Sequence, residues 1–389
     1  MLKRAGGIVM RTALTLGLCL MAVTAVAAPR SKSGDNLEAQ ASTAGYIQRE
    51  TFRSQMNANV VTIMAGSPNG TDLGIAYDIA QVVDDGDNLR VLPIVGKGAA
   101  QSVKDVMFLK GVDMGITQAN IIKYFARSGE LGPNLVDQIV YVAKLFTEEV
   151  HIIVRSDITD IKQLDGKSVN FGEEGSGTDI TAQLVLDALG VNVQRLHLSD
   201  TEALEKLKSG EIAAVVVMAG KPASELAGLK EADGLKFLRI PYPKELEDAY
   251  YPALLTHDDY PELVPAGESV DTVSVCTVLI AFNWGGDNIR YKRVAKFIDG
   301  FFSKFDEFLQ PSRNPKWREV NFAATLEGWR RSPASQAWID RAGSVAGATA
   351  KTSFDSFLAH TAQVGGKPIS DSERADLFRA FLEWNKQPH

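Results

Sequence analysis

The sequence predicts an α/β protein built from two similar lobes that share one cleft. β-branched runs alternate with amphipathic runs over residues 59–120, and the same alternation returns over residues 168–220. The tripeptide Gly-Thr-Asp starts a predicted helix in each part, at Gly70–Asp72 and at Gly177–Asp179. Alternating strands and helices indicate a parallel sheet, and such sheets bind ligands at the carboxyl ends of their strands. We therefore expect one glycine-rich helix start from each lobe to point into a common cleft.

The first lobe begins with a β-branched strand at residues 59–66 that ends in glycine. Apolar residues at helical spacing predict a helix directly after it, and they are Leu73, Ala76, Ile79, Ala80 and Val83. The next expected elements are a strand at 89–96, a helix at 99–111 and a strand at 112–120.

The run QIVYVAKLFTEEVHIIVR (138–155) is too long for one ordinary strand, so it predicts two strands, at 139–146 and 149–155. The second lobe then repeats the plan of the first. Its expected elements are a strand at 168–172, a helix at about 179–189, a helix and a strand within 202–220, and a strand at 235–240. A long strand at 273–282 and a helix at 287–309 follow.

The N-terminus has the layout of a cleavable secretory signal peptide. Lys3, Arg4 and Arg11 precede an apolar run, ALTLGLCLMAVTAVAA (Ala13–Ala28), and Ala25-Val26-Ala27 fits the cleavage pattern. The alternative is an uncleaved membrane anchor, for which the run is short. We expect residues 1–27 to be removed and the mature protein to be periplasmic, with no stable membrane insertion.

Charge, cysteines and histidines narrow the function classes. The net charge is −7, and removal of Lys3, Arg4 and Arg11 with the signal lowers it to about −10, which disfavours nucleic acid as a partner. The mature chain keeps only Cys276, in an apolar strand, where we expect a buried and unreactive thiol. The five histidines lack metal-ligand spacing and no catalytic motif appears, so we expect neither metal nor cofactor, and a binding protein rather than an enzyme.

Residues 311–389 differ from the rest of the chain because they hold four of the five tryptophans: Trp317, Trp329, Trp338 and Trp384. A capping box at Ser370–Glu373 precedes an amphipathic pattern, which predicts a helix. We interpret this part as a helical extension packed against the first lobe, and a docking surface for a partner is the alternative.

The predicted helix starts suit anions. A helix start presents unpaired N–H groups and a partial positive charge, and glycine lets a ligand approach the backbone. GSGT (Gly175–Thr178) therefore suits a carboxylate or a phosphate, although a plain helix cap is the alternative. Lys97, in VGKGAAQS, either neutralises an anion in the cleft or is a solvated loop charge.

These segments resemble the TAXI-type solute receptors of tripartite ATP-independent periplasmic (TRAP) transporters. The resemblance covers roughly residues 59–305, and its most specific segments are GSGTDITAQLVLDALG and GEIAAVVVMAGKPA. It implies the type II periplasmic-binding fold, with two α/β lobes joined by two crossing strands that act as a hinge near His151 and Cys276. It also implies small carboxylates, such as glutamate or a dicarboxylate, as ligands and a TRAP-type membrane permease as partner.

Carried over residue by residue, the resemblance implies a set of ligand contacts from both lobes. The first lobe would supply Ser67, Asn69, Gly70, Thr71, Lys97, Gln101, Ser102 and Gln118. The second would supply Gly175, Ser176, Gly177, Thr178, Met218, Ala219 and Gly220. The chain departs from the family at Asp72-Leu73, where aromatic residues are usual, and at Glu173-Glu174, where uncharged residues are usual. Both departures add negative charge and favour a zwitterion over a strongly anionic solute.

The sequence therefore predicts a periplasmic receptor that binds a small carboxylate between its lobes. The expected segments are a signal peptide (1–27), a leader with one helix (28–58), the first lobe (59–150 and 272–310), the second lobe (151–271) and the extension (311–389). An enzyme on the same fold, a transferase or lyase using Lys97, His151 or Asp72, is one alternative. An exported interaction protein acting through residues 311–389 is the other.

Overall fold

The computed structural model describes residues 32–86 and 88–342. The chain divides into a first unit, Met1–Gln55, and a second unit, Met56–His389. The first unit contributes most of helix α1 (Lys32–Ala58), which agrees with one helix in the predicted leader. The predicted signal peptide, the capping box at Ser370–Glu373 and Trp384 lie outside the described residues. No helix within the described ranges is both long and apolar enough to span a bilayer.

The first lobe follows the predicted alternation. Its strands β1, β2 and β3 are parallel, with β1 in the middle. Its elements are β1 (Val60–Met64), α2 (Thr71–Val83), β2 (Arg90–Ile94), α3 (Ala99–Phe108), β3 (Met114–Gln118), α4 (Ala119–Ser128) and α5 (Leu135–Gln138).

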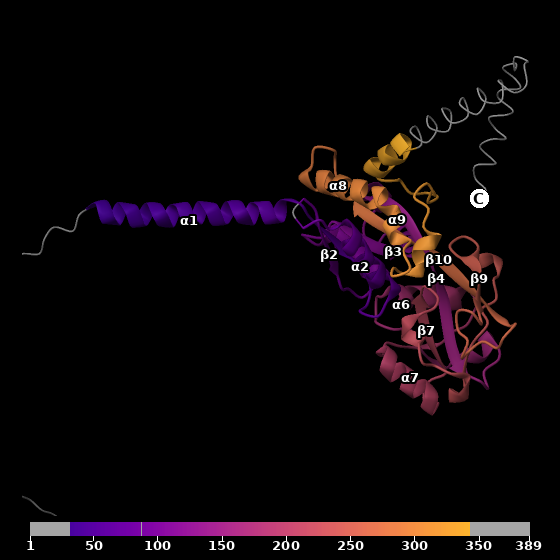
Figure 1. Cartoon of the computed structure of the whole chain (residues 1–389). Helices are drawn as coiled ribbons and strands as arrows, with labels where there is room; N and C mark the ends of the chain where they lie inside the picture. The colour runs from indigo at the N-terminus through magenta and orange to yellow at the C-terminus, as the bar shows by residue number, and fades with distance from the viewer. Residues whose placement is uncertain (1–31, 87, 343–389) are drawn as a thin grey trace, which may run out of the picture. The chain divides into compact units, whose positions relative to one another are not determined.

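The two lobes are joined by two long strands, β4 (Ile139–Arg155) and β10 (Ser269–Phe282). They pair antiparallel with each other from Ile139 to Glu149 of β4, and β4 then pairs with β7 (Ala214–Ala219). Figure 1 shows both strands passing through the second unit side by side. The prediction of two separate strands in residues 139–155 was therefore wrong. The run exceeds ordinary strand length because it serves both lobes in turn.

The second lobe has a parallel core of β5 between β6 and β7, as the repeated pattern predicts. Two short strands, at residues 194–196 and 251–256, were not predicted from the sequence. The elements are the 3-10 helix η1 (Ile161–Leu164), β5 (Ser168–Asn170), α6 (Gly177–Ala188), β6 (Gln194–Leu196), α7 (Asp200–Ser209), the 3-10 helices η2 (Ser224–Leu226), η3 (Glu231–Asp233) and η4 (Lys244–Leu246), β8 (Leu235–Phe237) and β9 (Tyr251–Thr256).

The strand order is β2-β1-β3-β10-β4-β7-β5-β6, with β8 on β4 and β9 on β10. Each lobe thus has a parallel sheet that the two crossing strands extend. Two α/β lobes joined by crossing strands make the periplasmic-binding-protein fold, so the predicted fold class is confirmed.

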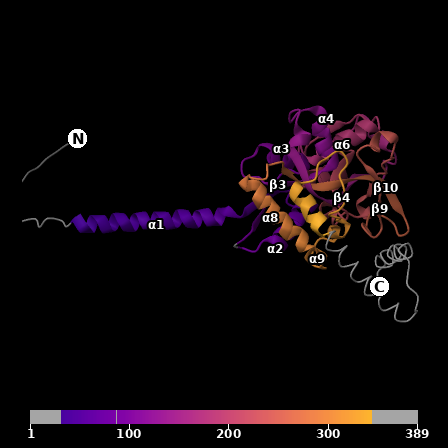
Figure 2. The same ribbon diagram turned by 90° about the horizontal axis from the view of Figure 1, so that it is seen from above.

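Each lobe buries apolar side chains on both faces of its sheet. In the first lobe, α2 and α8 (Ile289–Ser303) cover one face, and α3 and α4 cover the other. Figure 2 shows these two helix pairs on opposite sides of β3. The helix predicted at 287–309 is broken at Lys304, after which α9 (Phe305–Phe308) begins. Burial of each large apolar side chain contributes about 1.5–3 kcal/mol.

The described part of the C-terminal extension packs against the first lobe. The 3-10 helix η5 (Pro315–Glu319) inserts Trp317, which is fully buried against Phe301 and Phe308. The indole N–H of Trp317 donates to Asp78 of α2 at 2.8 Å. Trp329 and Trp338 are half-buried against the same lobe. Residues 311–342 therefore complete the core of this lobe, and their tryptophans do not form an exposed docking surface.

Candidate functional site

A pocket of about 220 Å³ lies where the two lobes meet. Its walls come from the loops that follow β1, β2 and β3 in the first lobe and β5, β6 and β7 in the second. This is the edge at which open α/β sheets hold ligands. This volume is large enough to hold several waters, which suits a small solute.

Three helices begin at the pocket wall. Helices α2 and α3 have glycine at the N-cap, Gly70 and Gly98, so no side chain occupies the first-turn N–H groups. Helix α6 differs because the Ser176 hydroxyl caps it, accepting from the Asp179 N–H at 3.1 Å. Uncapped helix starts leave N–H groups and a partial positive charge free for a ligand.

The lobes touch at both sides of the pocket, so the structure is a closed form. On one side, the Gly220 N–H donates to Thr71 Oγ1 at 3.2 Å and the Ser224 hydroxyl donates to the Asn69 carbonyl at 2.6 Å. On the other side, the Asn120 amide of α4 donates to Thr181 Oγ1 of α6 at 2.8 Å. These bonds form only when the lobes are together.

Gly177 allows a close approach of the two lobes. A Cβ at this position would lie 2.9 Å from the Ala99 Cβ and 3.0 Å from Gln118 Oε1, both in the first lobe. Carbon atoms do not approach to 2.9 Å without contact strain. Glycine is therefore required at position 177 by the closed form, beyond any role in a ligand cradle.

Residues 63–283, more than half of the chain, match the NMT1-like family. The chain belongs to the NMT1-like family. All residues that line the pocket lie within this region.

Solved structures with similar topology share little sequence with the chain. A structure described as a periplasmic transporter is 15% identical, with a TM-score of 0.42, and the match covers 63% of this chain and 83% of that one. The periplasmic binding protein BugD is 13% identical, with a TM-score of 0.41, and the match covers 67% of this chain and 85% of that one. The periplasmic aliphatic sulphonate binding protein SsuA of Escherichia coli is 15% identical, with a TM-score of 0.39, and the match covers 64% of this chain and 73% of that one. The assignment of the fold rests on the strand order of this chain.

Most of the site residues predicted for this NMT1-like chain line one pocket. They are Ser67, Asn69, Gly70, Thr71, Lys97, Gln118, Ser176, Gly177, Thr178 and Met218. The two glycine-rich helix starts thus reach a common cleft, as the repeated Gly-Thr-Asp motif predicts.

Five other predicted site residues do not line the pocket. Gln101 accepts from the Lys97 N–H at 2.6 Å and shapes the loop from behind, and Ser102 is fully buried beneath Gly115. Gly175 turns the chain ahead of α6 with a positive φ of 73°. Ala219 belongs to the apolar core of the second lobe, and Gly220 bonds to Thr71 at the lobe contact.

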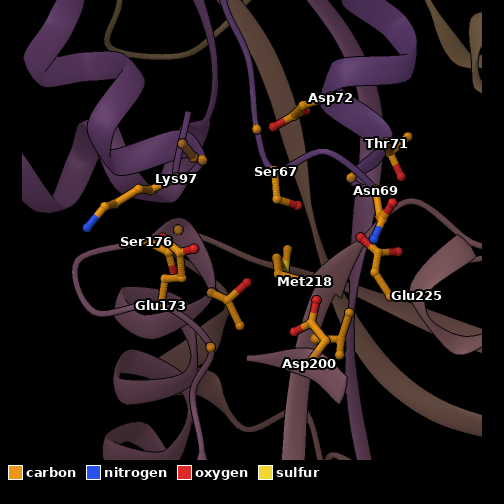
Figure 3. A pocket seen from close by; sticks show the side chains of 18 of the residues that line it. Ser67, Asn69, Thr71, Asp72, Lys97, Glu173, Ser176, Asp200, Met218 and Glu225 are labelled. Carbon is orange, nitrogen blue, oxygen red and sulfur yellow. The ribbon is translucent and has the colours of Figure 1, made fainter. Parts of the chain in front are cut away.

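Three acids that line the pocket were not expected from the sequence: Glu148, Asp200 and Glu225. With Asp72 and Glu173, whose negative charge is noted above, they bring five carboxyl groups to the wall. Figure 3 labels four of the five, Asp72, Glu173, Asp200 and Glu225. A signal was available for Glu148. The pair Glu148-Glu149 interrupts an otherwise apolar strand, and buried charged pairs are rare in strands.

The carboxyl groups deepest in the pocket are hard to ionise. Asp72 is 6% exposed, and its burial, with the charge of Glu225 as a smaller cause, raises its pKa to about 7. Burial, with the nearby charge of Asp72, raises the pKa of Glu148 well above its usual range. Glu148 accepts from the Gln118 amide at 2.5 Å, which is a neutral donor. A solute that brings positive charge would favour the ionised forms.

Glu149 points to different partners from its neighbour Glu148. Its carboxylate lies 3.4 Å from the buried ammonium of Lys316 and accepts from the Lys221 N–H at 2.9 Å. Glu319 extends this network by accepting from the Thr147 N–H at 2.9 Å. The extension is thereby bonded to β4 at the point where that strand passes between lobes.

The candidates for an enzyme mechanism are not assembled. His151 is fully buried in the second lobe, 2.7 Å from the Tyr260 hydroxyl, and it does not line the pocket. Lys97 is exposed at the rim, and Asp72 faces other acids. Within residues 32–86 and 88–342 no group of three potential ligands could hold a metal ion. Cys276 is a free, buried thiol whose pKa is raised by burial, as predicted.

Proposed function

We propose that this protein is a periplasmic solute receptor that closes its two lobes over a small carboxylate-bearing solute and delivers it to a membrane permease. The observation that carries the proposal is the pocket itself, enclosed by both lobes and lined by helix starts from each. Membership of the NMT1-like family and the predicted signal peptide at residues 1–27 support it.

The starts of α2 and α3 provide the binding chemistry for the carboxylate. Each start offers free N–H groups and a partial positive charge, and each contributes about 0.3–1 kcal/mol to binding of an anion, or up to about 2 kcal/mol in a partly buried site. Ser67 and Thr71 add hydroxyl groups at the same wall. No bond is made or broken, and the bound solute leaves unchanged.

Closure couples binding to recognition by the partner. The bonds from Gly220 to Thr71 and from Asn120 to Thr181 exist only in the closed form, so a solute that contacts both lobes shifts the population toward that form. A permease that recognises the closed outline then receives only loaded receptor. The resemblance of GSGTDITAQLVLDALG and GEIAAVVVMAGKPA to TAXI-type receptors favours a TRAP-type permease.

Thermal unfolding against a solute panel tests the receptor function. The panel contains amino acids, dicarboxylates, diamines and sugar acids, added to protein first freed of retained solute by partial unfolding and dialysis. A solute present at 100 times its dissociation constant stabilises the folded protein by about 2.7 kcal/mol. We expect a clear rise in melting temperature with one chemical class. No rise with any solute would contradict the proposal.

The Thr71→Ala variant reports on the first-lobe wall, since it removes a pocket hydroxyl that also accepts from Gly220. The solute-induced rise in melting temperature is expected to shrink. Ser176→Ala is a less clean probe because it also removes the cap of α6, which costs about 1 kcal/mol without any solute. The rise caused by the solute, and not the melting temperature itself, is therefore compared between variants.

A further inference from the structure

Three carboxyl groups from separate elements line the pocket, near enough that, besides burial, the charges of two of them, Asp72 and Glu225, raise the pKa of the third, Glu148. Asp72 comes from the first turn of α2, Glu148 from the crossing strand β4 and Glu225 from η2. Figure 3 shows Asp72 with Ser67 and Asn69 on the part of the wall that the first lobe supplies, and Glu225, Glu173 and Asp200 on the part that the second lobe supplies. Asp72, Glu148 and Glu225 thus come from the first lobe, from the strand that joins the lobes and from the second lobe, respectively.

The buried side chain of Asp72 has a carboxyl oxygen that lacks a hydrogen-bond partner in the described protein. Its side chain is 6% exposed, and its Oδ1 atom is buried without any hydrogen-bond partner in the described protein. Burial of a carboxylate without compensation costs far more free energy than a folded protein gains from one contact. Without a ligand, the buried Asp72 would lower the stability of the folded protein. This cost points to a ligand group that binds the Asp72 carboxyl group.

The described residues do not supply a cation to these acids. The basic residue at the pocket wall is Lys97, which is exposed and directed outward in Figure 3. Lys316 is paired with Glu149 and Glu319, and Lys221 with Asp259. An ammonium group on an organic solute would supply the missing positive charge.

We propose that Asp72, Glu148 and Glu225 form a subsite for an ammonium group of the solute. This inference rests on the proposed function, and it narrows the solute to a small amine, with amino acids favoured and dicarboxylates rejected. The helix starts hold the carboxylate of such a zwitterion and the three acids hold its ammonium. Each added charge-assisted hydrogen bond is among the stronger polar contacts available to a protein.

Binding through this subsite depends on pH. The groups that face Asp72 and Glu148 are Glu225 of η2, Glu149 of β4 with its partner Lys316, and Glu173, Asp200 and Lys97 at the outer wall. An ammonium group lowers the pKa of the buried carboxyls, so its binding releases a proton. Affinity for an amine therefore rises with pH between about 5.5 and 8, because Asp72, whose pKa is raised to about 7, is then increasingly ionised before the solute arrives.

Three probes of equal length separate the charge classes: glutarate, 4-aminobutyrate and 1,3-diaminopropane. Each has three methylene groups, and the ends are two carboxylates, one of each, or two ammonium groups. Their affinities for the purified protein are measured by titration calorimetry at pH 5.5, 6.5 and 7.5, with the wider panel of amines and dicarboxylates beside them. We expect the amines to bind more tightly than the matched dicarboxylates, and their affinity to rise with pH.

The outcomes separate the two proposals. Binding of dicarboxylates with an affinity that falls as pH rises would mean that protonated acids donate to a carboxylate. That result would overturn the ammonium subsite and leave the receptor function standing. If no solute of any class binds, the receptor function itself is overturned. Binding of the diamine alone supports the subsite and removes the carboxylate from the proposed solute.

Variants locate the subsite. Asp72→Asn and Glu148→Gln keep the shape of each side chain and remove its charge, and we expect each to weaken binding of the preferred amine about 10- to 100-fold. Glu174→Gln is the matched control, since Glu174 is exposed in the same loop as Glu173 and does not line the pocket. Equal losses in all three variants would show a general charge effect, and unchanged affinity in Asp72→Asn and Glu148→Gln would overturn the subsite.

Discussion

Gly177 of the second lobe lies against Ala99 of the first, so closely that a Cβ on residue 177 would stand 2.9 Å from the Ala99 Cβ. Both residues begin a helix at the pocket wall, α6 and α3. The fit between the lobes therefore depends on the contact of Gly177 with the Ala99 side chain, at the site where the solute is held. A substitution that adds one carbon at residue 177 therefore affects the closure of the lobes more than the folding of either lobe.

Gly177→Ala is expected to hinder closure and leave each lobe folded. The added methyl group meets Ala99 and Gln118, which are both held by core packing, so the lobes have to stay slightly apart. Affinity for the solute should fall at least tenfold, which corresponds to about 1.4 kcal/mol of lost closure energy. Titration calorimetry measures the affinity, and circular dichroism checks the fold.

Gly285→Ala is the control for this variant, since a Cβ at position 285 meets nothing within 4 Å. Its affinity for the solute should match that of the unaltered protein. A Gly177→Ala protein that binds as tightly as the Gly285→Ala protein would mean that binding does not require the closed form described here.

Asp72→Asn is expected to stabilise the empty protein at alkaline pH. The pKa of Asp72 is raised to about 7 in the folded state from an ordinary value of 3.8. Between these values the folded protein keeps the proton and the unfolded chain loses it, so the contribution of Asp72 to stability falls as pH rises. At 1.36 kcal/mol per pKa unit, the gain in Asp72→Asn approaches about 4 kcal/mol above pH 7 as an upper value.

Urea unfolding at pH 4.5, 6 and 8 measures this gain. The difference between Asp72→Asn and the unaltered protein should be about 1 kcal/mol at pH 4.5 and should grow toward its upper value at pH 8. Asp157→Asn, at an exposed position, serves as the control. A difference that is constant with pH would show that Asp72 titrates normally and that its burial has been compensated.

His151 is expected to make the protein lose stability as pH falls from about 6.5 to 4. Burial lowers its pKa to about 4 from 6.5, so over this range the unfolded chain binds a proton that the folded protein does not. The loss approaches about 3 kcal/mol at 1.36 kcal/mol per unit. His151→Gln should remove this part of the pH dependence, measured by urea unfolding at pH 4.5, 5.5 and 7.

The same substitution at His257, in the loop after β9, should leave the acid-dependent loss in place. If the His151→Gln protein loses as much stability on acidification as the His257→Gln protein, the buried His151 ring is not the group responsible.

Trp317→Ala is expected to destabilise the first lobe by about 3–5 kcal/mol, the usual cost of removing a large buried aromatic side chain. The fully buried indole ring packs on Phe301 and Phe308, and its N–H is bonded to Asp78. Thermal and urea unfolding measure the loss. Trp338→Ala, which truncates a half-buried ring, should cost clearly less. Equal small costs would place the start of the extension outside the core.

The strands and helices of both lobes follow from the sequence because their apolar patterns are strong and local. The period of the apolar residues predicts α2, and the β-branched runs predict β1 and β7. The continuity of β4 could not be predicted in this way. Its length depends on pairing with β10 over one part and β7 over the other, which are contacts with residues far along the chain.

The residues of the candidate site also differ in how far the local sequence predicts them. Residues next to a helix start, such as Thr71 and Ser176, were found because the motif itself marks the end of a strand. Glu225 was not found, because it lies in a short 3-10 helix after β7 and reaches the pocket only through the folding of the second lobe. Gln101 and Ser102 were expected in the wall, but the turn of α3 directs them away from it.

The claim that the lobes close over an ammonium-bearing solute is tested most directly by melting temperature with and without amines in two proteins, the unaltered chain and Gly177→Ala. We expect a rise for the unaltered chain with 4-aminobutyrate or another amine of the panel. We expect little or no rise for Gly177→Ala, and no rise with glutarate for either protein. A rise of equal size in both proteins, or a rise with glutarate and not with any amine, would contradict it.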